Sequence, residues 1–334
     1  MQRREFLVST AAAVAGLAGA RLGWAQSAGP DWRKVKPSTL DRISIMTLNF
    51  DRMLKLADAP EGPERTLELF DIAQMIADTY GVHKVEFQHY HIPSTEPSYL
   101  KELRAHIEKS KSRMTQINVE FGNLNISAPR LRDRLMAIDL TKMWIDHAAA
   151  LGALRVMINQ GQLTEENKAI AIPALKTMTD YGRSKNIIVS VETRGGGGGR
   201  GRGTAAGVAP TGATASASSA PAPAAAQAPA QQPPPNQPAV WKLLAETIKG
   251  AGAYSNVDVG GAGAANQEEL HDCLRLFFPM TAGSLHTRVS PRWDLATAMK
   301  FLEHDLGYKG LYNIEASNGH DGTKEIFDVV VATL

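Results

Sequence analysis

Short stretches rich in β-branched and other apolar residues alternate along the chain with longer segments whose apolar residues recur every three or four positions. The short stretches predict eight strands, at residues 42–49, 83–88, 115–121, 154–159, 186–192, 255–258, 282–286 and 310–315. Helical periodicity predicts helices between them, for example at 64–80, 99–112, 130–151 and 295–306. Eight strands that alternate with helices predict an α/β fold, a single-domain (β/α)8 TIM barrel over residues 42–334.

Residues 1–25 carry the three parts of an export signal. The pair Arg3-Arg4 opens the segment, a weakly apolar Ala/Gly-rich run continues to about Ala20, and Ala25 ends a small-residue cleavage site. The segment resembles a twin-arginine signal peptide, so we expect cleavage after Ala25 and export of the folded protein by the twin-arginine machinery. The expected location is periplasmic or otherwise extracytoplasmic. The alternatives are an N-terminal membrane anchor and a chance arginine pair.

A low-complexity tract at residues 195–239 interrupts the alternation after the fifth predicted strand. It begins with five glycines and continues as a Pro/Ala/Gln stretch with almost no large apolar side chains. Such a composition cannot offset the entropy lost on ordering, so the tract is predicted to be a disordered insertion in one loop. Without it and the signal, 264 residues remain, close to the roughly 250 typical of these barrels. Residues 26–41 are interpreted as an N-terminal arm.

Charge and cysteine content exclude several classes of protein. Removing residues 1–25 leaves 33 cationic and 33 anionic side chains, so the mature chain offers no electrostatic basis for binding nucleic acid. Its single cysteine, Cys273, cannot form an internal disulfide or a thiolate metal cluster. No stretch after residue 25 has the roughly 18 apolar residues of a membrane span, so no stable span is expected after cleavage.

Four successive predicted strands end with a side chain that can bind a metal. Alternation places Glu192, Asp258, His286 and Glu315 on the polar, inward side of strands five to eight, at the carboxyl ends where barrel enzymes keep their active sites. Taken singly, each acid could be a helix cap or an ion-pair partner, and the histidine a hydrogen-bonded core residue. Together they predict an oxygen-rich divalent metal site, with Mn²⁺ favoured and Mg²⁺, Co²⁺ and Zn²⁺ as alternatives.

The chain from residue 42 to its end resembles the xylose-isomerase-like superfamily of TIM-barrel sugar phosphate isomerases and epimerases. Four passages carry the resemblance: Ile-Ile-Val-Ser-Val-Glu at 187–192, Val-Asp-Val-Gly at 257–260, Leu-His-Thr-Arg at 285–288, and Gly-Tyr-Lys-Gly-Leu-Tyr-Asn-Ile-Glu at 307–315. The ordered Glu, Asp, His and Glu ligands of the family correspond to Glu192, Asp258, His286 and Glu315. The resemblance implies that Glu192 and Glu315 also act as acid and base, on opposite faces of a sugar, through an enediolate.

The same resemblance implies substrate contacts and also shows departures from the family. Arg292 stands six residues after the ligand histidine, where ketose 3-epimerases have an arginine, and Arg288 stands where many relatives have lysine. Either arginine holds a substrate oxygen or lies in a solvated loop. The position of a substrate-binding histidine three residues after the ligand aspartate is Gly261 here. Gly261 and the low-complexity tract both lie at the expected mouth of the barrel, where the strands end. They put the identity of the substrate in question more than they do the binding of a metal.

Weaker candidates for substrate contact follow strands two and four. His89 and His91 come directly after strand two and either contact a sugar or belong to a polar loop. Glu86 has the inward parity of that strand, so it either orients substrate or is an internal carboxylate paired with a buried cation such as Lys84 or Arg155. Asn159 ends strand four and can hydrogen-bond a hydroxyl.

The sequence therefore favours an extracytoplasmic, divalent-metal-dependent sugar isomerase or epimerase, or a lyase or dehydratase that uses the same proton abstraction. The expected partner is a small sugar or keto-sugar, and the oligomeric state stays open, a homo-oligomer included. The first alternative is a non-catalytic carbohydrate-binding barrel. The second is a metal hydrolase like the type IV apurinic endonucleases, which Gly261 and the neutral charge disfavour.

Overall fold

The computed structural model describes residues 31–56, 59–60, 62–193 and 237–334. The expected signal peptide and nearly all of the low-complexity tract lie outside the described residues. Within them, eight parallel strands form a closed barrel in chain order, each hydrogen-bonded to its neighbours, and β8 closes on β1. The strands are β1 (Ile43–Met46), β2 (Lys84–Gln88), β3 (Arg113–Val119), β4 (Arg155–Ile158), β5 (Ile188–Glu192), β6 (Tyr254–Asp258), β7 (Thr281–Thr287) and β8 (Leu311–Ile314). The predicted TIM barrel is confirmed.

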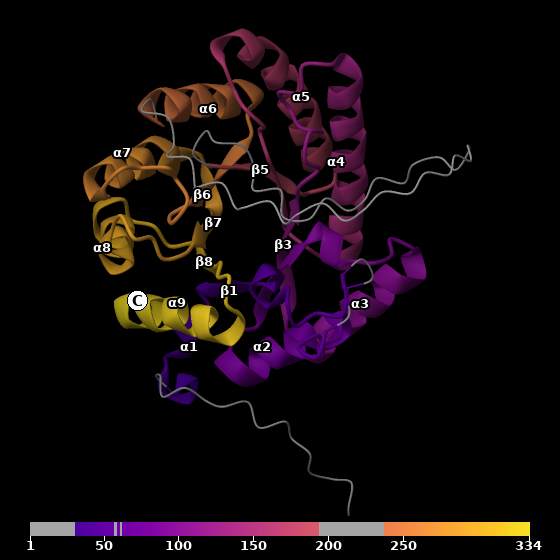
Figure 1. Ribbon diagram of the computed structural model, residues 1–334, viewed down its shortest axis with the longest axis vertical. Coiled ribbons are helices and arrows are strands. Elements are labelled where there is room, and N and C mark those ends of the chain that lie inside the picture. The colour runs from indigo at the N-terminus through magenta and orange to yellow at the C-terminus, as the bar shows by residue number, and fades with distance from the viewer. Residues whose placement is uncertain (1–30, 57–58, 61, 194–236) are drawn as a thin grey trace, which may run out of the picture.

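Helices surround the strands on the outside of this barrel (Figure 1). They are α1 (Pro37–Leu40), α2 (Ile72–Tyr80), α3 (Pro97–Lys109), α4 (Leu131–Leu151), α5 (Glu165–Ser184), α6 (Gln237–Ala251), α7 (Gln267–Phe277), α8 (Leu295–Lys300) and α9 (Gly319–Thr333). Local signals fix several of their ends. Pro97 starts α3 at a position where its missing N–H costs nothing, and Gly152 ends α4 with a left-handed φ of 75°. Among the described residues, no helix combines the length and the apolar character of a membrane span.

Two predicted helices differ from the observed ones. The helix predicted at 64–80 begins only at Ile72, because Leu67 is extended and forms a β-bridge with Leu54. The helix predicted at 295–306 is α-helical only to Lys300 and continues as a π-helical turn over Phe301–Asp305. Both differences lie outside the barrel strands and leave the site unaffected.

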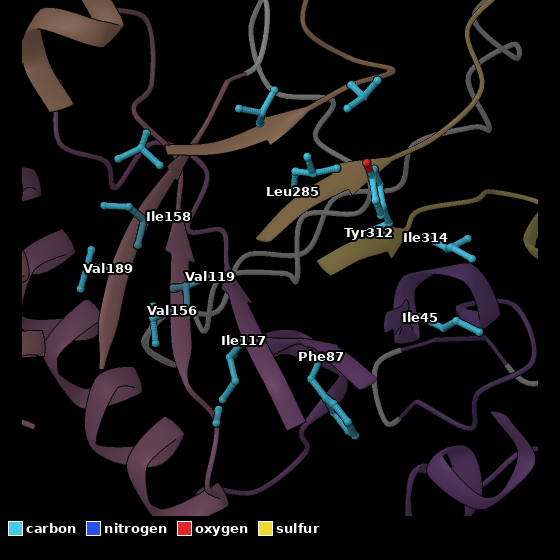
Figure 2. Close-up of a cluster of buried hydrophobic side chains, with 14 of the residues drawn as sticks. Ile45, Phe87, Ile117, Val119, Val156, Ile158, Val189, Leu285, Tyr312 and Ile314 are labelled. Atoms are coloured by element: carbon cyan, nitrogen blue, oxygen red, sulfur yellow. The ribbon is translucent and has the colours of Figure 1, made fainter. Parts of the chain in front are cut away.

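The apolar core lies between the strands and the helices. Outward-facing side chains such as Phe87, Val156, Val189, Leu285 and Tyr312 are all buried there (Figure 2). Removal of such side chains from water is the main source of stability in this fold, at about 1.5–3 kcal/mol for each large one. The core thus holds each strand in the orientation that turns its alternate residues into the barrel.

The inside of the barrel is unusually polar. Fully buried polar side chains line its inner face. They are Ser44, Gln116, Asn118, Ser190, Asn256, Ser284 and Asn313. Several bond to one another, such as Asn313 Nδ2 to Ser284 Oγ at 2.5 Å and Ser44 Oγ to Thr115 Oγ1 at 3.0 Å. Branched apolar residues usually fill this space. Here the polar interior leads directly to the carboxyl ends of the strands.

Candidate metal centre

The four predicted strand-end residues meet at one mouth of the barrel. Glu192 and Asp258 are the last residues of β5 and β6, His286 is the next-to-last residue of β7, and Glu315 directly follows β8. Asp258 pairs with His286 in the parallel register between β6 and β7. The first three are at most 1% exposed and Glu315 is 8% exposed. Strand-end parity therefore predicted correctly which side chains converge.

His286 lies at the centre of this group, held on both ring nitrogens. Its Nδ1 is 3.0 Å from Glu192 Oε1 and 3.2 Å from Glu315 Oε2, and its Nε2 is 2.7 Å from Glu86 Oε1. Burial alone would lower the pKa of His286, but the three carboxylates outweigh it and raise that pKa well above the ordinary value. The imidazole is therefore protonated when it faces only these acids.

The donor atoms of Glu192, His286 and Glu315 suit a divalent cation. One ligand atom of each lies within 4.8 Å of the others, and all three residues are buried. Two carboxylates and an imidazole form the mixed oxygen and nitrogen set that Mn²⁺, Co²⁺ or Zn²⁺ accepts. The second oxygen of Glu86, Oε2, is buried and has no hydrogen-bond partner among the described residues. This surplus of negative oxygen atoms fits a metal centre.

Asp258 reaches the same mouth but has different partners. Its Oδ2 lies 2.8 Å from Arg288 Nη2, and its Oδ1 accepts a 2.7 Å hydrogen bond from the Gly261 N–H. Arg288 Nη1 is 3.3 Å from Glu315 Oε1, so the guanidinium bridges two acids. Burial raises the pKa of Asp258 to about 6, with Glu315 and Glu192 adding to the effect and Arg288 opposing it. Asp258 is thus part of the site without lying in the compact group around His286.

Glu86 contacts the second ring nitrogen of His286. It is fully buried and accepts a 2.5 Å hydrogen bond from Asn118 Nδ2, in addition to its contact with His286. The cations expected as alternative partners bond elsewhere, Lys84 to Asp41 at 2.9 Å and Arg155 Nη2 to the Ala282 carbonyl at 2.8 Å. The alternative in which Glu86 pairs with Lys84 or Arg155 is therefore not observed, and its carboxylate meets His286 instead.

The two histidines after β2 form part of the wall. They lie in the 3-10 turn His89–His91. His91 is buried, with Nδ1 2.8 Å from Thr47 Oγ1 and Nε2 3.1 Å from Asp51 Oδ1. His89 contacts three aromatic rings, and burial lowers its pKa to about 4. Neither residue joins the group around His286, so the structure places both in positions that support the loop.

The remaining expected substrate contacts lie at different depths. Asn159 directly follows β4, and its buried Oδ1 has no hydrogen-bond partner among the described residues, which leaves it able to accept from a hydroxyl. Arg292 is exposed and donates through Nη1 to the Ala264 carbonyl at 3.0 Å. Arg288 touches the acids of the site directly, whereas Arg292 contacts the loop after β6.

Sequence reasoning missed the chain of hydrogen bonds behind the histidine. Gln116 Nε2 donates to Asn118 Oδ1 at 2.9 Å, and Asn118 in turn donates to Glu86. A signal was present, because two polar residues spaced by two in a buried strand share its inward face. These hydrogen bonds orient the Glu86 carboxylate, which in turn holds the His286 ring.

Solved structures with a similar fold include a xylose isomerase domain protein, sugar epimerases and a dehydratase. A xylose isomerase domain protein from Planctomyces limnophilus is 14% identical, with a TM-score of 0.56 over 87% of this chain and 94% of that chain. The 3-keto-D-glucoside 4-epimerase of E. coli is 11% identical, with a TM-score of 0.58 over 88% and 100%. A probable 3-DHS dehydratase from Bacillus anthracis is 11% identical, with a TM-score of 0.55 over 87% and 97%. No protein-family model and no curated protein sequence matches the chain.

Proposed function

We propose that the protein is a divalent-metal-dependent sugar isomerase or epimerase that acts outside the cytoplasm. The observation that carries the proposal is the buried group of Glu192, His286 and Glu315 at the mouth of the barrel. The likeness to barrels that include sugar epimerases supports it. The twin-arginine-like segment at residues 1–25 supports the location.

Glu192, Glu315 and the imidazole Nδ1 of His286 would hold the metal, because these atoms face one another. A bound divalent cation polarises a carbonyl and so acidifies the neighbouring C–H. Glu86 accepts from Nε2–H of His286 and leaves Nδ1 as the nitrogen available for a ligand bond. Because its carboxylate is engaged by His286 Nε2 and by the Asn118 amide, Glu86 is assigned to positioning His286.

The carboxylates of Glu192 and Glu315 would transfer the proton of the substrate. Glu192 ends β5 and Glu315 follows β8, so they approach the mouth from different strands, as an acid and a base on two faces of one substrate must. Asn159 Oδ1 and the Arg288 guanidinium supply an acceptor and a donor for hydroxyl or carbonyl oxygens. Which sugar is bound decides between isomerisation, epimerisation and the related dehydration.

The charges at the mouth favour a neutral sugar over a phosphorylated one. Among the described residues, four carboxylates, those of Glu86, Glu192, Asp258 and Glu315, face the guanidinium of Arg288 and the imidazole. With a divalent cation and a neutral imidazole, the formal charge of these groups still sums to −1. An added phosphate would meet net repulsion in a partly buried site, where screening is weak.

Hydrogen exchange tests the proposal directly. The protein, loaded with Mn²⁺, would be incubated with a panel of keto-sugars in D₂O, and deuterium at carbon next to the carbonyl would be followed by NMR. We expect exchange in the wild type and its loss in Glu192→Gln and Glu315→Gln. Glu325→Gln makes the same chemical change at an exposed position of α9 and should leave exchange intact. Sugar binding without any exchange would instead favour the carbohydrate-binding alternative.

A further inference from the structure

Both carboxylate oxygens of Asp258 contact groups of the protein. Oδ1 accepts a hydrogen bond from the Gly261 N–H at 2.7 Å, and Oδ2 forms an ion pair with Arg288 Nη2 at 2.8 Å. Opposite charges at this distance attract strongly where the carboxylate is buried. The ligand atoms of Glu192, His286 and Glu315, in contrast, point at one another within 4.8 Å. Asp258 therefore meets the Arg288 guanidinium, Glu192 meets His286, and Glu315 meets His286 through Oε2 and the guanidinium through Oε1.

The loop after β6 is shaped to admit this guanidinium. A Cβ on Gly261 would lie 1.8 Å from Asp258 Oδ2 and 1.9 Å from Arg288 Nη2. A Cβ on Gly260 would lie 2.1 Å from Arg288 Cγ and 2.6 Å from its carbonyl oxygen. Neither glycine has a left-handed φ, so space and not backbone conformation requires them. The Gly260-Gly261 pair and Arg288 thus form one arrangement, in which the arginine side chain lies across the end of β6.

From this packing we propose that Asp258 anchors Arg288 and is not a metal ligand, so that the metal centre is a three-residue site of Glu192, His286 and Glu315. The proposal rests on the metal-dependent function argued above. A three-ligand protein site leaves more of the metal's coordination positions open to substrate. Anchored between Asp258 and Glu315, Arg288 presents its donors beside those open positions, where a substrate oxygen would meet them.

A charge-neutral double variant tests this division of roles. Asp258→Asn alone would change the net charge near the metal. Asp258→Asn combined with Arg288→Gln removes one negative and one positive charge, so the net charge is unchanged. Mn²⁺ affinity of the full-length chain would be measured by the EPR signal of free Mn²⁺ during titration. We expect the double variant to stay within about threefold of the wild type, while Glu192→Gln loses about 100-fold or more. An equal loss in both variants would show that Asp258 is a ligand and overturn the proposal.

Arg288→Gln tests the same point from the other side. It removes the guanidinium from Asp258 and so exposes a fourth carboxylate to the metal. We expect this variant to bind Mn²⁺ about tenfold more tightly than the wild type. Unchanged or weaker binding would contradict the proposal, even if the double variant failed to fold. A wild type that binds no Mn²⁺ would refute the metal-dependent function itself, which separates that failure from the failure of the three-residue site.

Discussion

Both ends of the barrel hold carboxylates that are largely shielded from solvent, but among the described residues only those at the amino-terminal end are matched with donors. At the amino-terminal end, Glu303 receives two hydrogen bonds from Arg42, at 2.7 and 2.8 Å, and one from the Tyr312 hydroxyl at 2.7 Å. Lys309 adds a fourth contact at 3.1 Å. Burial by itself would raise the pKa of Glu303, yet these donors lower it to about 2. At the mouth, burial instead raises the pKa of Asp258 to about 6.

The difference separates a structural network from a binding site. An acid with a full set of donors is stable as it stands, and removing it leaves buried partners unsatisfied. Among the described residues of the mouth, four acids surround one arginine and one histidine, an excess of negative charge that a divalent cation would neutralise. In a chain with both arrangements, the unmatched one is the candidate for function.

The largest effect is expected at the amino-terminal end. Glu303→Gln should lower the free energy of unfolding by about 2–4 kcal/mol, because it leaves the Arg42 guanidinium in a largely enclosed position without its anion. Urea unfolding followed by circular dichroism measures this. Glu108→Gln is the matched control, because it removes an exposed (i, i+4) pair with Arg104 and should cost less than about 0.5 kcal/mol.

The stabilisation by the Glu303–Arg42 ion pair should decrease at low pH. Since the pKa of Glu303 is lowered to about 2 from an ordinary 4.5, its stabilisation is complete above about pH 4.5 and is lost as the pH falls through 2. The gap in unfolding free energy between wild type and Glu303→Gln should therefore narrow in this range. A gap that is constant from pH 6 to pH 2 would show that the charge of Glu303 does not stabilise the fold.

Local periodicity predicted the part of the site that depends on single strands. Glu192, His286 and Glu315 converge because each occupies an inward position at the end of its own strand, and parity can be counted from the sequence. The eight strands were predictable for the same reason. The late start of α2 was not, because it depends on the Leu54–Leu67 bridge.

Contacts across the barrel could not be predicted in this way. Glu86 on β2 meets His286 on β7, and which pairs touch across the interior depends on side-chain length and on the tilt of all the strands. The Arg288–Asp258 pair depends further on the space that Gly261 provides. Such contacts depend on the three-dimensional arrangement of the closed barrel and cannot be counted along single strands.

Metal binding at the mouth of the barrel should raise the free energy of unfolding, whereas the Glu303 network at the amino-terminal end should be insensitive to metal. Mn²⁺ at 100 times its dissociation constant should raise the free energy of unfolding of the wild type by about 2.7 kcal/mol, through mass action. Glu192→Gln should abolish this gain. In the metal-free protein, however, it should change stability by less than about 1 kcal/mol, because Glu86 and Glu315 still flank His286 and glutamine can still accept from Nδ1–H.

That contrast can fail in a specific way. If Glu192→Gln destabilised the metal-free protein as strongly as Glu303→Gln does, the acids at the mouth would be as well matched as Glu303, and the distinction between the two ends would be lost. Glu303→Gln with and without Mn²⁺ completes the comparison. Its cost should be the same in both conditions, because Glu303 lies at the opposite end of the strands from the metal group.

The smallest effect is expected for Glu86, which would act on the metal only through His286. Glu86→Gln should weaken Mn²⁺ binding about tenfold, because the carboxylate that holds Nε2–H and increases the basicity of Nδ1 becomes a neutral amide. ¹⁵N chemical shifts of the His286 ring in the metal-free protein give an independent measurement, since a lower pKa should release the ring proton at lower pH than in wild type. Glu325→Gln is the control for both measurements. Weakened metal binding with an unchanged His286 titration would mean that Glu86 acts on the metal directly, as a ligand in its own right.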